Sequence, residues 1–215
     1  MRNKASAIIF RKQILPFSET FIAAQGKFLQ KYTPLFTGYK NDLSGRKLLQ
    51  NHPCFVLEDY TRSVELAKLS ARLGLVNRSW LNAIRQHSPS IIHAHFLKDG
   101  IDALTLKEKL SLPLITTLHG HDITKKEKRS LLIKSRSHFF AKADKVIAVS
   151  DYIYQQALDN GCPEDKLVKH SIGIDIQQFT QEKSESELPE LLFVGRLTEK
   201  KGCIYLLQAM SILKS

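Results

Sequence analysis

The stretch that decides the fold of this chain is IIHAHFLKDGIDALTLKEKLSLPLITTLHGHD, residues 91–122. It opens with a short apolar run, Ile91–His95, continues with a helical pattern over Asp99–Leu110, and returns to an apolar run at Leu112–Leu118. Two apolar runs joined by an amphipathic helix are typical of parallel β-strands with a crossover helix. We therefore expect a β-α-β unit whose strands are buried on both faces.

The same alternation continues on both sides of this unit. The other expected strands are Ser6–Phe10, Pro34–Thr37, Cys54–Leu57, Lys145–Val149 and Leu167–Ile172. The other expected helices are Glu19–Tyr32 (capped by Ser18), Val64–Leu75, Trp80–His87, Ser130–Lys142 and Asp151–Asn160. Strands alternating with helices in this way predict an α/β fold, a doubly wound parallel sheet.

The composition of the chain changes near its C-terminal end. Residues 177–190 are polar, acidic and proline-containing, which favours a linker between a domain over 1–176 and a new unit over 191–215. That unit reads as a strand, Leu191–Val194, a loop, and a helix that starts at Cys203. One β-loop-α unit cannot bury its own apolar faces. Either it packs against the first domain, or it is the start of a second, C-terminally truncated domain, which is what we expect.

The charge of the chain is strongly positive. Its 215 residues include 32 Lys and Arg against 21 Asp and Glu, a formal net charge of +11. Basic residues gather between Lys125 and Lys145, which favours an anionic partner such as a membrane surface. A solvated helix face fits the same run. No nucleic-acid motif or aromatic platform accompanies it, so we expect no nucleic-acid partner.

Neither the N-terminal segment nor the cysteines of the chain indicate a secreted protein. The apolar segment Ala5–Phe10 is too short for a signal peptide, and no apolar run is long enough to span a bilayer. We expect a cytoplasmic protein, peripheral on the inner face of the plasma membrane. Three scattered cysteines, Cys54, Cys162 and Cys203, argue against a disulfide framework and for small buried or half-buried residues.

Polar residues follow several expected strands, where parallel α/β sheets bind ligands. His95 ends one strand, and His119, Gly120, His121 and Asp122 follow the next. Gly120 permits a sharp turn, and an imidazole there can bind a sugar hydroxyl or a phosphate oxygen. A strand-end histidine satisfied by neighbouring backbone is the competing interpretation.

A metal site is a further alternative for the same histidines. His93 and His95, and likewise His119 and His121, are spaced two apart, which places each pair on one side of a strand. With a nearby aspartate such pairs could hold zinc in a hydrolase. No further His or Asp set completes a metal shell, so we expect no metal.

A second candidate site is FVGRLTEKKG, Phe193–Gly202. A strand, a glycine turn at Gly195, and then Arg196 and Lys201 before a helix resemble a phosphate-binding arrangement. The loop lacks the spacing of a P-loop. An exposed basic loop is the other interpretation.

In combination, these segments resemble the retaining nucleotide-sugar glycosyltransferases of family 4, which have the two-domain GT-B fold with Rossmann-like halves. The likeness runs in order through the following stretches: Pro16–Ile22, Ile92–Phe96, Leu118–Asp122, Ala143–Ser150, Ser171–Asp175 and Phe193–Gly202. The segment SETFI, residues 18–22, is similar to members that build exopolysaccharide or lipopolysaccharide.

The resemblance implies roles for individual residues. His119 matches a histidine that contacts the donor sugar, and Arg196 and Lys201 match a basic pair on the donor diphosphate. The other substrate-binding residues that we expect are Ser18, Glu19, His95, Gly120, Asp122 and Gly195. The implied donor is a nucleoside diphosphate sugar, the acceptor is lipid-linked or a saccharide, and no cofactor is needed.

The sequence leaves two alternatives to the transfer of a sugar with retention of its anomeric configuration. The chain could be a non-catalytic module that binds an acceptor or a partner, or, with less support, a metal-dependent hydrolase. Because the family's nucleotide pocket lies mostly in the second domain, we expect residues 1–215 alone to be inactive.

Overall fold

The computed structural model describes residues 5–49, 51–124, 130–178 and 190–213. It divides the chain into a first unit, Met1–Ile174, and a second unit, Asp175–Ser215. The predicted linker at 177–190 falls largely outside the described residues, and the predicted domain boundaries stay predictions.

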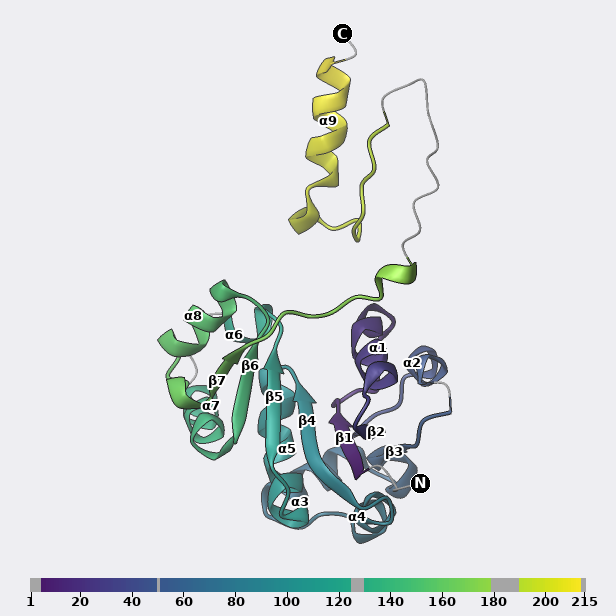
Figure 1. The fold of residues 1–215 in the computed structure, drawn as a ribbon, viewed down its shortest axis with the longest axis vertical. Helices are drawn as coiled ribbons and strands as arrows, with labels where there is room; N and C mark the ends of the chain where they lie inside the picture. Colours follow the sequence, from purple (N-terminus) through teal and green to yellow (C-terminus); the bar gives the residue numbers. More distant parts are fainter. Residues whose placement is uncertain (1–4, 50, 125–129, 179–189, 214–215) are drawn as a thin grey trace. The chain divides into compact units, whose positions relative to one another are not determined.

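The first unit is built on one parallel sheet in the order β3-β2-β1-β4-β5-β6-β7 (Figure 1). The strands are β1 (Ala5–Phe10), β2 (Tyr32–Gly38), β3 (Cys54–Val56), β4 (Pro89–His95), β5 (Leu114–Leu118), β6 (Lys145–Ala148) and β7 (Leu167–Lys169). All neighbouring pairs in this order are parallel. The predicted doubly wound α/β sheet is confirmed.

Helices connect these strands. The α-helices of the first unit are α1 (Thr20–Phe28), α2 (Leu43–Leu48), α3 (Val64–Arg72), α4 (Arg78–Arg85), α5 (Leu97–Leu110), α6 (His121–Thr124), α7 (Ser130–Lys142) and α8 (Asp151–Asp159). Short 3-10 helices are η1 (Phe17–Glu19), η2 (Leu57–Tyr60) and η3 (Glu164–Lys166). The sequence analysis did not predict α2 or α6, which are too short for a clear helical period.

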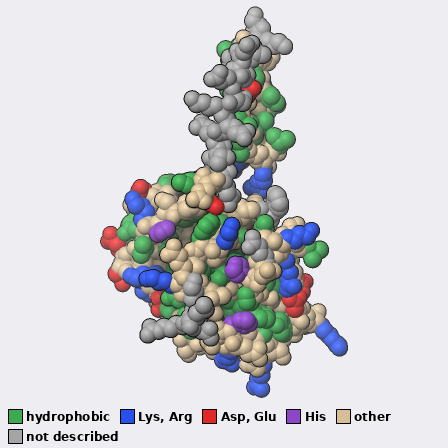
Figure 2. Space-filling view, turned by 45° about the vertical axis from the view of Figure 1, so that its right-hand side comes forward, with side chains coloured by type: hydrophobic (Ala, Val, Ile, Leu, Met, Phe, Trp, Pro, Cys, Tyr) green, Lys and Arg blue, Asp and Glu red, His purple; other side chains and the backbone are tan. Residues whose placement is uncertain are grey.

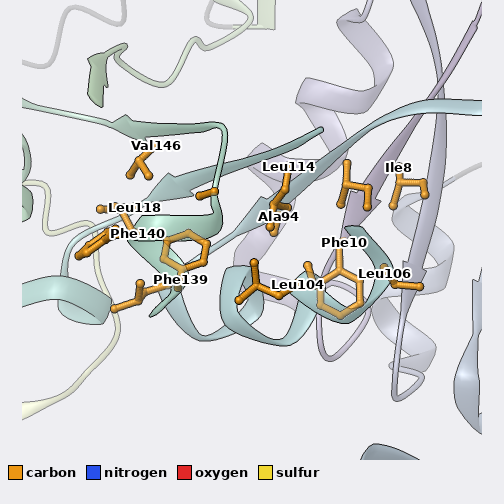
Figure 3. Close-up of a cluster of buried hydrophobic side chains, with 14 of the residues drawn as sticks. Ile8, Phe10, Ala94, Leu104, Leu106, Leu114, Leu118, Phe139, Phe140 and Val146 are labelled. Atoms are coloured by element: carbon orange, nitrogen blue, oxygen red, sulfur yellow. The ribbon is translucent and has the colours of Figure 1, made fainter. Parts of the chain in front are cut away.

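Alternate residues of the strands pack into two cores, one on each face of the sheet. Ile8 and Phe10 of β1 belong to the larger core, which also contains Leu104 of α5 (Figure 3). Ile9 lies in the smaller core with Ile22 of α1. Because successive strand residues point to opposite faces, an apolar run such as SAIIF can serve both cores.

The start of α1 differs from the prediction. Ser18 does not cap the helix, because Phe17–Glu19 form a 3-10 turn and α1 begins only at Thr20. Glu19 occupies the cap position without capping, since its carboxylate is bound elsewhere. The helix also ends at Phe28, not at Tyr32, because Tyr32 starts β2 and pairs with Ala5.

The second unit contains η4 (Ile176–Gln178), η5 (Glu199–Lys201) and the helix α9 (Cys203–Leu213). The predicted helix from Cys203 is confirmed, but the predicted strand at Leu191–Val194 is wrong, since these residues form no strand. A strand needs a neighbouring strand for its backbone hydrogen bonds, and the described part of the second unit provides none.

The positive charge of the chain is distributed over its surface. Basic side chains are spread over the face seen in Figure 2 and do not gather in one place. Of the predicted basic cluster, Lys125, Lys126, Lys128 and Arg129 lie outside the described residues, whereas Lys134, Lys142 and Lys145 are exposed.

Among the residues that the structure describes, no helix has the length and apolar character to cross a bilayer. The three cysteines are free and buried or half-buried, as predicted.

One glycine sets how closely α5 lies on the sheet. A Cβ atom on Gly100 would lie 2.6 Å from Oγ1 of Thr116 on β5 and 2.7 Å from Cε2 of Phe139 on α7. We predict that Gly100→Ala lowers the free energy of unfolding by about 1–3 kcal/mol, because this overpacking outweighs the better helix propensity of alanine. Urea unfolding followed by the fluorescence of Trp80 measures the change.

Gly173→Ala is the matched control. A Cβ at Gly173 would meet nothing within 4 Å, so we expect a change within about 0.5 kcal/mol. An unfolding midpoint of Gly100→Ala equal to that of the native sequence would contradict the close packing of α5.

Candidate functional site

The candidate site lies where the order of the strands reverses. From β1 the chain proceeds outward to β2 and β3, then returns to β4 on the other side of β1. Helices on the two sides of such a switch point diverge, so ligands bind in the crevice beyond the carboxyl ends of the strands there. Arg11 follows β1, Phe96 follows β4, and His119 follows the adjacent β5.

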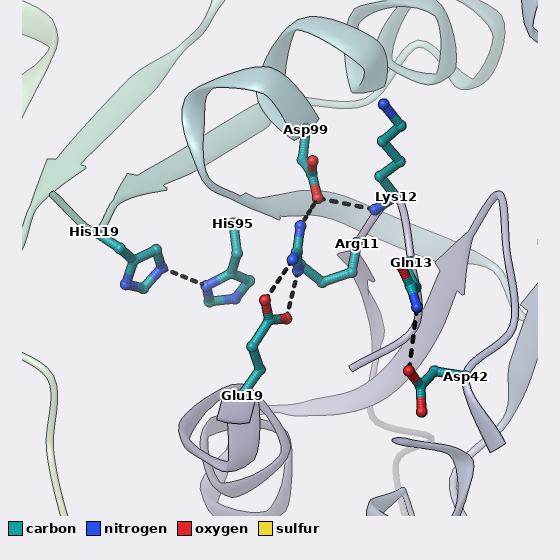
Figure 4. A network of polar contacts seen from close by, with 8 residues as sticks. All are labelled: Arg11, Lys12, Gln13, Glu19, Asp42, His95, Asp99 and His119. Carbon is teal, nitrogen blue, oxygen red and sulfur yellow. Dashed lines mark hydrogen bonds and ion pairs between the residues drawn. The ribbon is translucent and has the colours of Figure 1, made fainter. Parts of the chain in front are cut away.

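Arg11 bridges two carboxylates at this point (Figure 4). Its Nε donates to Oε2 of Glu19 at 2.7 Å, and its Nη2 donates to Oε1 at 2.5 Å, so that the pair is bidentate. Its Nη1 donates to Oδ2 of Asp99 near the start of α5. The amide of Lys12 donates to the same oxygen at 2.8 Å. The bridge therefore joins the end of β1 to η1 and to α5.

The charges of this bridge are nearly withdrawn from water. The exposed fractions of the side chains are 12% for Arg11, 11% for Glu19 and 4% for Asp99. Burial alone would lower the pKa of Arg11, but the hydrogen bonds and charges of Glu19 and Asp99 outweigh it and raise the pKa. Burial raises the pKa of Asp99 to about 6, against the pull of Arg11 and the Lys12 amide. The guanidinium also lies 4.5 Å from the centre of the Phe96 ring, a cation–π contact.

Three histidine rings stack beside this bridge. The rings of His93 and His95 lie 4.5 Å apart and those of His95 and His119 5.3 Å apart, each pair within 23° of parallel. Nδ1 of His95 and Nε2 of His119 share a hydrogen bond of 3.0 Å (Figure 4). His93 is held by Gln25 of α1 at 3.3 Å and by Thr117 of β5 at 2.8 Å.

All three imidazoles are neutral at pH 7. Burial lowers the pKa of His93 and that of His119 to about 4. Burial, followed by the positive charges that His93, His119 and Arg11 can carry, lowers the pKa of His95 well below its usual value. In a neutral pair only one ring donates to the other. The outer nitrogens, Nε2 of His95 and Nδ1 of His119, are buried and have no hydrogen-bond partner in the described part of the chain.

Asp122 holds the loop that carries His119. Its Oδ1 accepts from the amides of Gly120 at 2.8 Å and His119 at 3.1 Å, and its Oδ2 accepts from the amide of Leu97 at 3.0 Å. Gly120 has a φ of +132°, which favours glycine. Burial raises the pKa of Asp122, although the amide hydrogen bonds oppose this. The carboxylate therefore ties the loop after β5 to the start of α5.

The structure brings some of the predicted site residues together. His95, His119, Gly120 and Asp122 are neighbours, and Glu19 reaches them through Arg11. Ser18 is exposed on η1. Gly195, Arg196 and Lys201 are exposed residues of the second unit, whose position relative to the histidines is not determined. The binding roles of all these residues stay predictions.

Sequence reasoning missed Arg11. The signal was present, because Arg11 directly follows the first apolar strand, at the same edge as the histidines. Asp99 was expected only as the first residue of a helix, and its contact with Arg11 was not expected because 88 positions in the chain separate the two.

The geometry gives little support to a metal centre. His95 and His119 turn nitrogens toward each other at 3.0 Å, so these two nitrogens do not converge on a common ion. His121 is exposed at the start of α6. Among the described residues, no group of three or more His, Cys, Asp or Glu side chains could hold a metal ion.

The buried histidines make stability depend on pH. Between pH 6.5 and 4 the unfolded chain binds protons that the folded His93, His95 and His119 exclude. Their contribution to the free energy of unfolding therefore falls as the pH falls, by about 3 kcal/mol for His93 alone at about 1.4 kcal/mol per pKa unit. Asp99 acts in the opposite direction between pH 3.8 and 6, because its pKa is higher in the folded chain. We expect the three histidines to outweigh it.

Urea unfolding at a series of pH values measures this dependence. His93→Gln removes one of the titrations, and we expect a shallower loss of stability between pH 6.5 and 4. His138→Gln, an exposed position on α7, should reproduce the native profile. A free energy of unfolding that rises throughout acidification would show that the stack is protonated in the folded chain.

Comparisons with known proteins agree with the fold. The family model described as Glycosyltransferase Family 4 matches residues 46–178. WcaL of Salmonella typhimurium, provisionally named a colanic acid biosynthesis glycosyltransferase, is 32% identical over 126 residues, 57% of this chain and 31% of WcaL. The amylovoran biosynthesis glycosyltransferase AmsK of Erwinia amylovora is 29% identical over 128 residues, 58% of this chain and 31% of AmsK. The chain thus spans about a third of the length of these relatives.

Solved structures share the fold. A glycosyltransferase from Rickettsia africae superposes with a TM-score of 0.73 at 19% identity, covering 99% of this chain and 58% of that one. HepE of Anabaena, solved with UDP-glucose, superposes with a TM-score of 0.59 at 18% identity, covering 82% of this chain and 46% of that one. Since the family model covers more than half of the 215 residues, the chain belongs to glycosyltransferase family 4.

Proposed function

We propose that the chain forms the acceptor side of a glycosyltransferase of cell-surface polysaccharide synthesis. The enzyme that contains this chain transfers a sugar, with retention of the anomeric configuration, from a nucleoside diphosphate sugar to a lipid-linked or saccharide acceptor at the inner face of the plasma membrane. Membership of family 4, relatives named for colanic acid and amylovoran biosynthesis, and a structural neighbour solved with UDP-glucose support this proposal.

The observation that carries the proposal is the unpaired Nδ1 of His119 at the switch point. A buried polar atom without a partner is costly and calls for a ligand or another explanation. Because the imidazole is neutral, a sugar hydroxyl can bind it without the cost of burying a charge. The rings of Phe21 and Phe96 lie beside the imidazole, with their centres 4.9 and 4.5 Å from its centre.

His95 acts as a positioning residue in this proposal. A single proton between Nδ1 of His95 and Nε2 of His119 decides whether the outer nitrogen of His119 donates or accepts. If His95 donates, Nδ1 of His119 carries a proton. If His119 donates, its Nδ1 has a free lone pair. The pair can therefore adapt to either role of a sugar hydroxyl while both rings stay neutral.

The diphosphate of the donor meets the second unit. Arg196 and Lys201 neutralise the charge that develops on the leaving diphosphate, and the turn at Gly195 brings backbone close to it. No metal is required when two cations perform this task. Asp122 and Glu19 act indirectly, because Asp122 holds the loop that carries His119 and Glu19 holds Arg11. Ser18, exposed on η1, faces the acceptor.

Calorimetric titration of the protein that carries this chain with UDP and with GDP tests the nucleotide part. We expect one of them to bind, and we expect the pair Arg196→Ala and Lys201→Ala to weaken binding about 10-fold or more, because two charge-assisted contacts to phosphate are lost. Lys200→Ala, a neighbouring exposed lysine, is the control and should change binding less than about 2-fold. Binding of a free saccharide without either nucleotide would instead favour a non-catalytic acceptor-binding module.

A sugar-transfer assay of the protein that carries this chain tests the chemistry. We expect His119→Ala to lower kcat about 100-fold, as for the loss of a polar contact made in the transition state. His138→Ala on α7 should leave kcat unchanged. Product NMR reports the anomeric configuration, and an inverted product would contradict transfer with retention.

A further inference from the structure

The helix α3 exposes its large apolar residues. The exposed fractions are 68% for Leu66 and 57% for Leu69, and 76% and 67% for Leu73 and Leu75, which follow the end of the helix. Leu66, Leu69 and Leu73 are spaced three and four residues apart, which places them on one face of the helix. A surface helix normally turns such a face toward the core.

The opposite face of α3 is the one that packs. Val64 and Ala67 pack against the larger core, and Ala71 is buried. Lys68 lies with them, its Nζ 5.6 Å from the centre of the Tyr39 ring and 3.2 Å from Oε1 of Glu65. The helix thus buries small residues and a lysine stem while its leucines face outward, which has no explanation within the first unit.

Cations lie beside Leu66 and Leu75. Two adjoining hollows, of about 530 and 330 Å³, share Leu75 and Val76 in their walls. Arg62 lines the larger hollow, and Arg78, Arg85 and Lys109 line the smaller one. None of the residues lining either hollow is acidic. The leucines and these cations together are named the α3 surface.

We propose that the α3 surface docks on an anionic lipid bilayer. The leucines enter the boundary between headgroups and acyl chains, and the cations bind lipid phosphates, as apolar and basic residues do in interfacial helices. With 9 residues, α3 lies along the bilayer and does not span it. This inference deepens the proposed function, because it rests on the proposed place at the inner face of the plasma membrane and names the surface that binds there, but it does not depend on nucleotide or sugar binding.

The position of the α3 surface suits this role. α4 leads directly into the start of β4, whereas the histidines lie beyond the end of β4. Figure 1 shows α3 and α4 beside each other at the end of the sheet away from α1 and α6. Docking there turns the carboxyl ends of the strands away from the bilayer, which leaves the site open to a saccharide acceptor in water.

The charges favour a bilayer over a second copy of the chain. In a two-fold dimer through α3, Arg62, Arg78 and the other cations would face their own copies and repel. The acidic residue of α3, Glu65, is bound by Lys40 at 3.0 Å and by Lys68, so it is engaged within its own chain. An acidic protein partner would match the charge. However, Leu69 and Leu73 are exposed and line neither hollow. This fits insertion into a bilayer, because lipid surrounds an inserted side chain on all sides.

Co-sedimentation with vesicles tests the proposal. We expect the chain to sediment with phosphatidylcholine vesicles that contain phosphatidylglycerol, and much less with phosphatidylcholine alone. The triple change Leu66→Ser, Leu69→Ser, Leu73→Ser should weaken binding about 10-fold or more. Because these side chains are exposed, the variant should keep its thermal unfolding midpoint. The pair Arg62→Glu and Arg78→Glu should abolish the preference for anionic vesicles.

Leu43→Ser on α2 and Leu131→Ser on α7 are matched controls, because these leucines are exposed by 83% and 75% outside the α3 surface. We expect both to bind vesicles as the native sequence does. Native-like binding by the folded triple variant, or loss of binding only in Leu131→Ser, would overturn the proposal. A lipid-free dimer that the triple variant dissociates would also overturn it and assign α3 to self-association. Nucleotide calorimetry on the triple variant keeps this test separate from the proposed function.

Discussion

The bridge from Arg11 to Glu19 and Asp99 is the interaction on which the candidate site depends. The backbone of Arg11 is tied to β2, since its amide donates to the carbonyl of Thr37 at 3.0 Å. Its guanidinium then reaches η1 on one side and α5 on the other. These elements diverge at the switch point, so the bridge fixes how far apart the end of β1, η1 and the start of α5 lie. Removing one partner of such a pair typically costs about 3–5 kcal/mol, because the remaining charge is left buried.

The bridge also contributes to the lowered pKa values of the neighbouring histidines, although burial is the main cause. Arg11 is a permanent positive charge beside them, and it adds to the effect of burial in lowering the pKa of His95 and His119. The site is thereby divided into two parts. Charged groups join the secondary-structure elements, whereas the neutral imidazoles have two nitrogens without a hydrogen-bond partner in the described part of the chain. This division suits the sugar that we propose as ligand, because its hydroxyl groups carry no charge.

Much of the fold followed from local patterns. The seven strands of the sheet were all located from apolar runs, because a buried parallel strand is apolar on both faces and stands out from its flanks. Patterns failed where a partner decided the outcome. Leu191–Val194 has the composition of a strand but forms none, and Ser18 has the chemistry of a helix cap but lies inside a 3-10 turn. Hydrophobicity does not report whether a neighbouring strand is present.

The sequence by itself determined the α/β class, the order of the elements, and which polar residues follow each strand, because these depend on near neighbours in the chain. It placed His95 and His119 at the ends of adjacent strands for the same reason. Only the tertiary structure decided that Arg11 binds Asp99, that the two histidines share a proton, and that α3 turns its leucines outward. Each of these outcomes depends on contacts between segments that are distant in the chain, and on how deeply packing withdraws them from water.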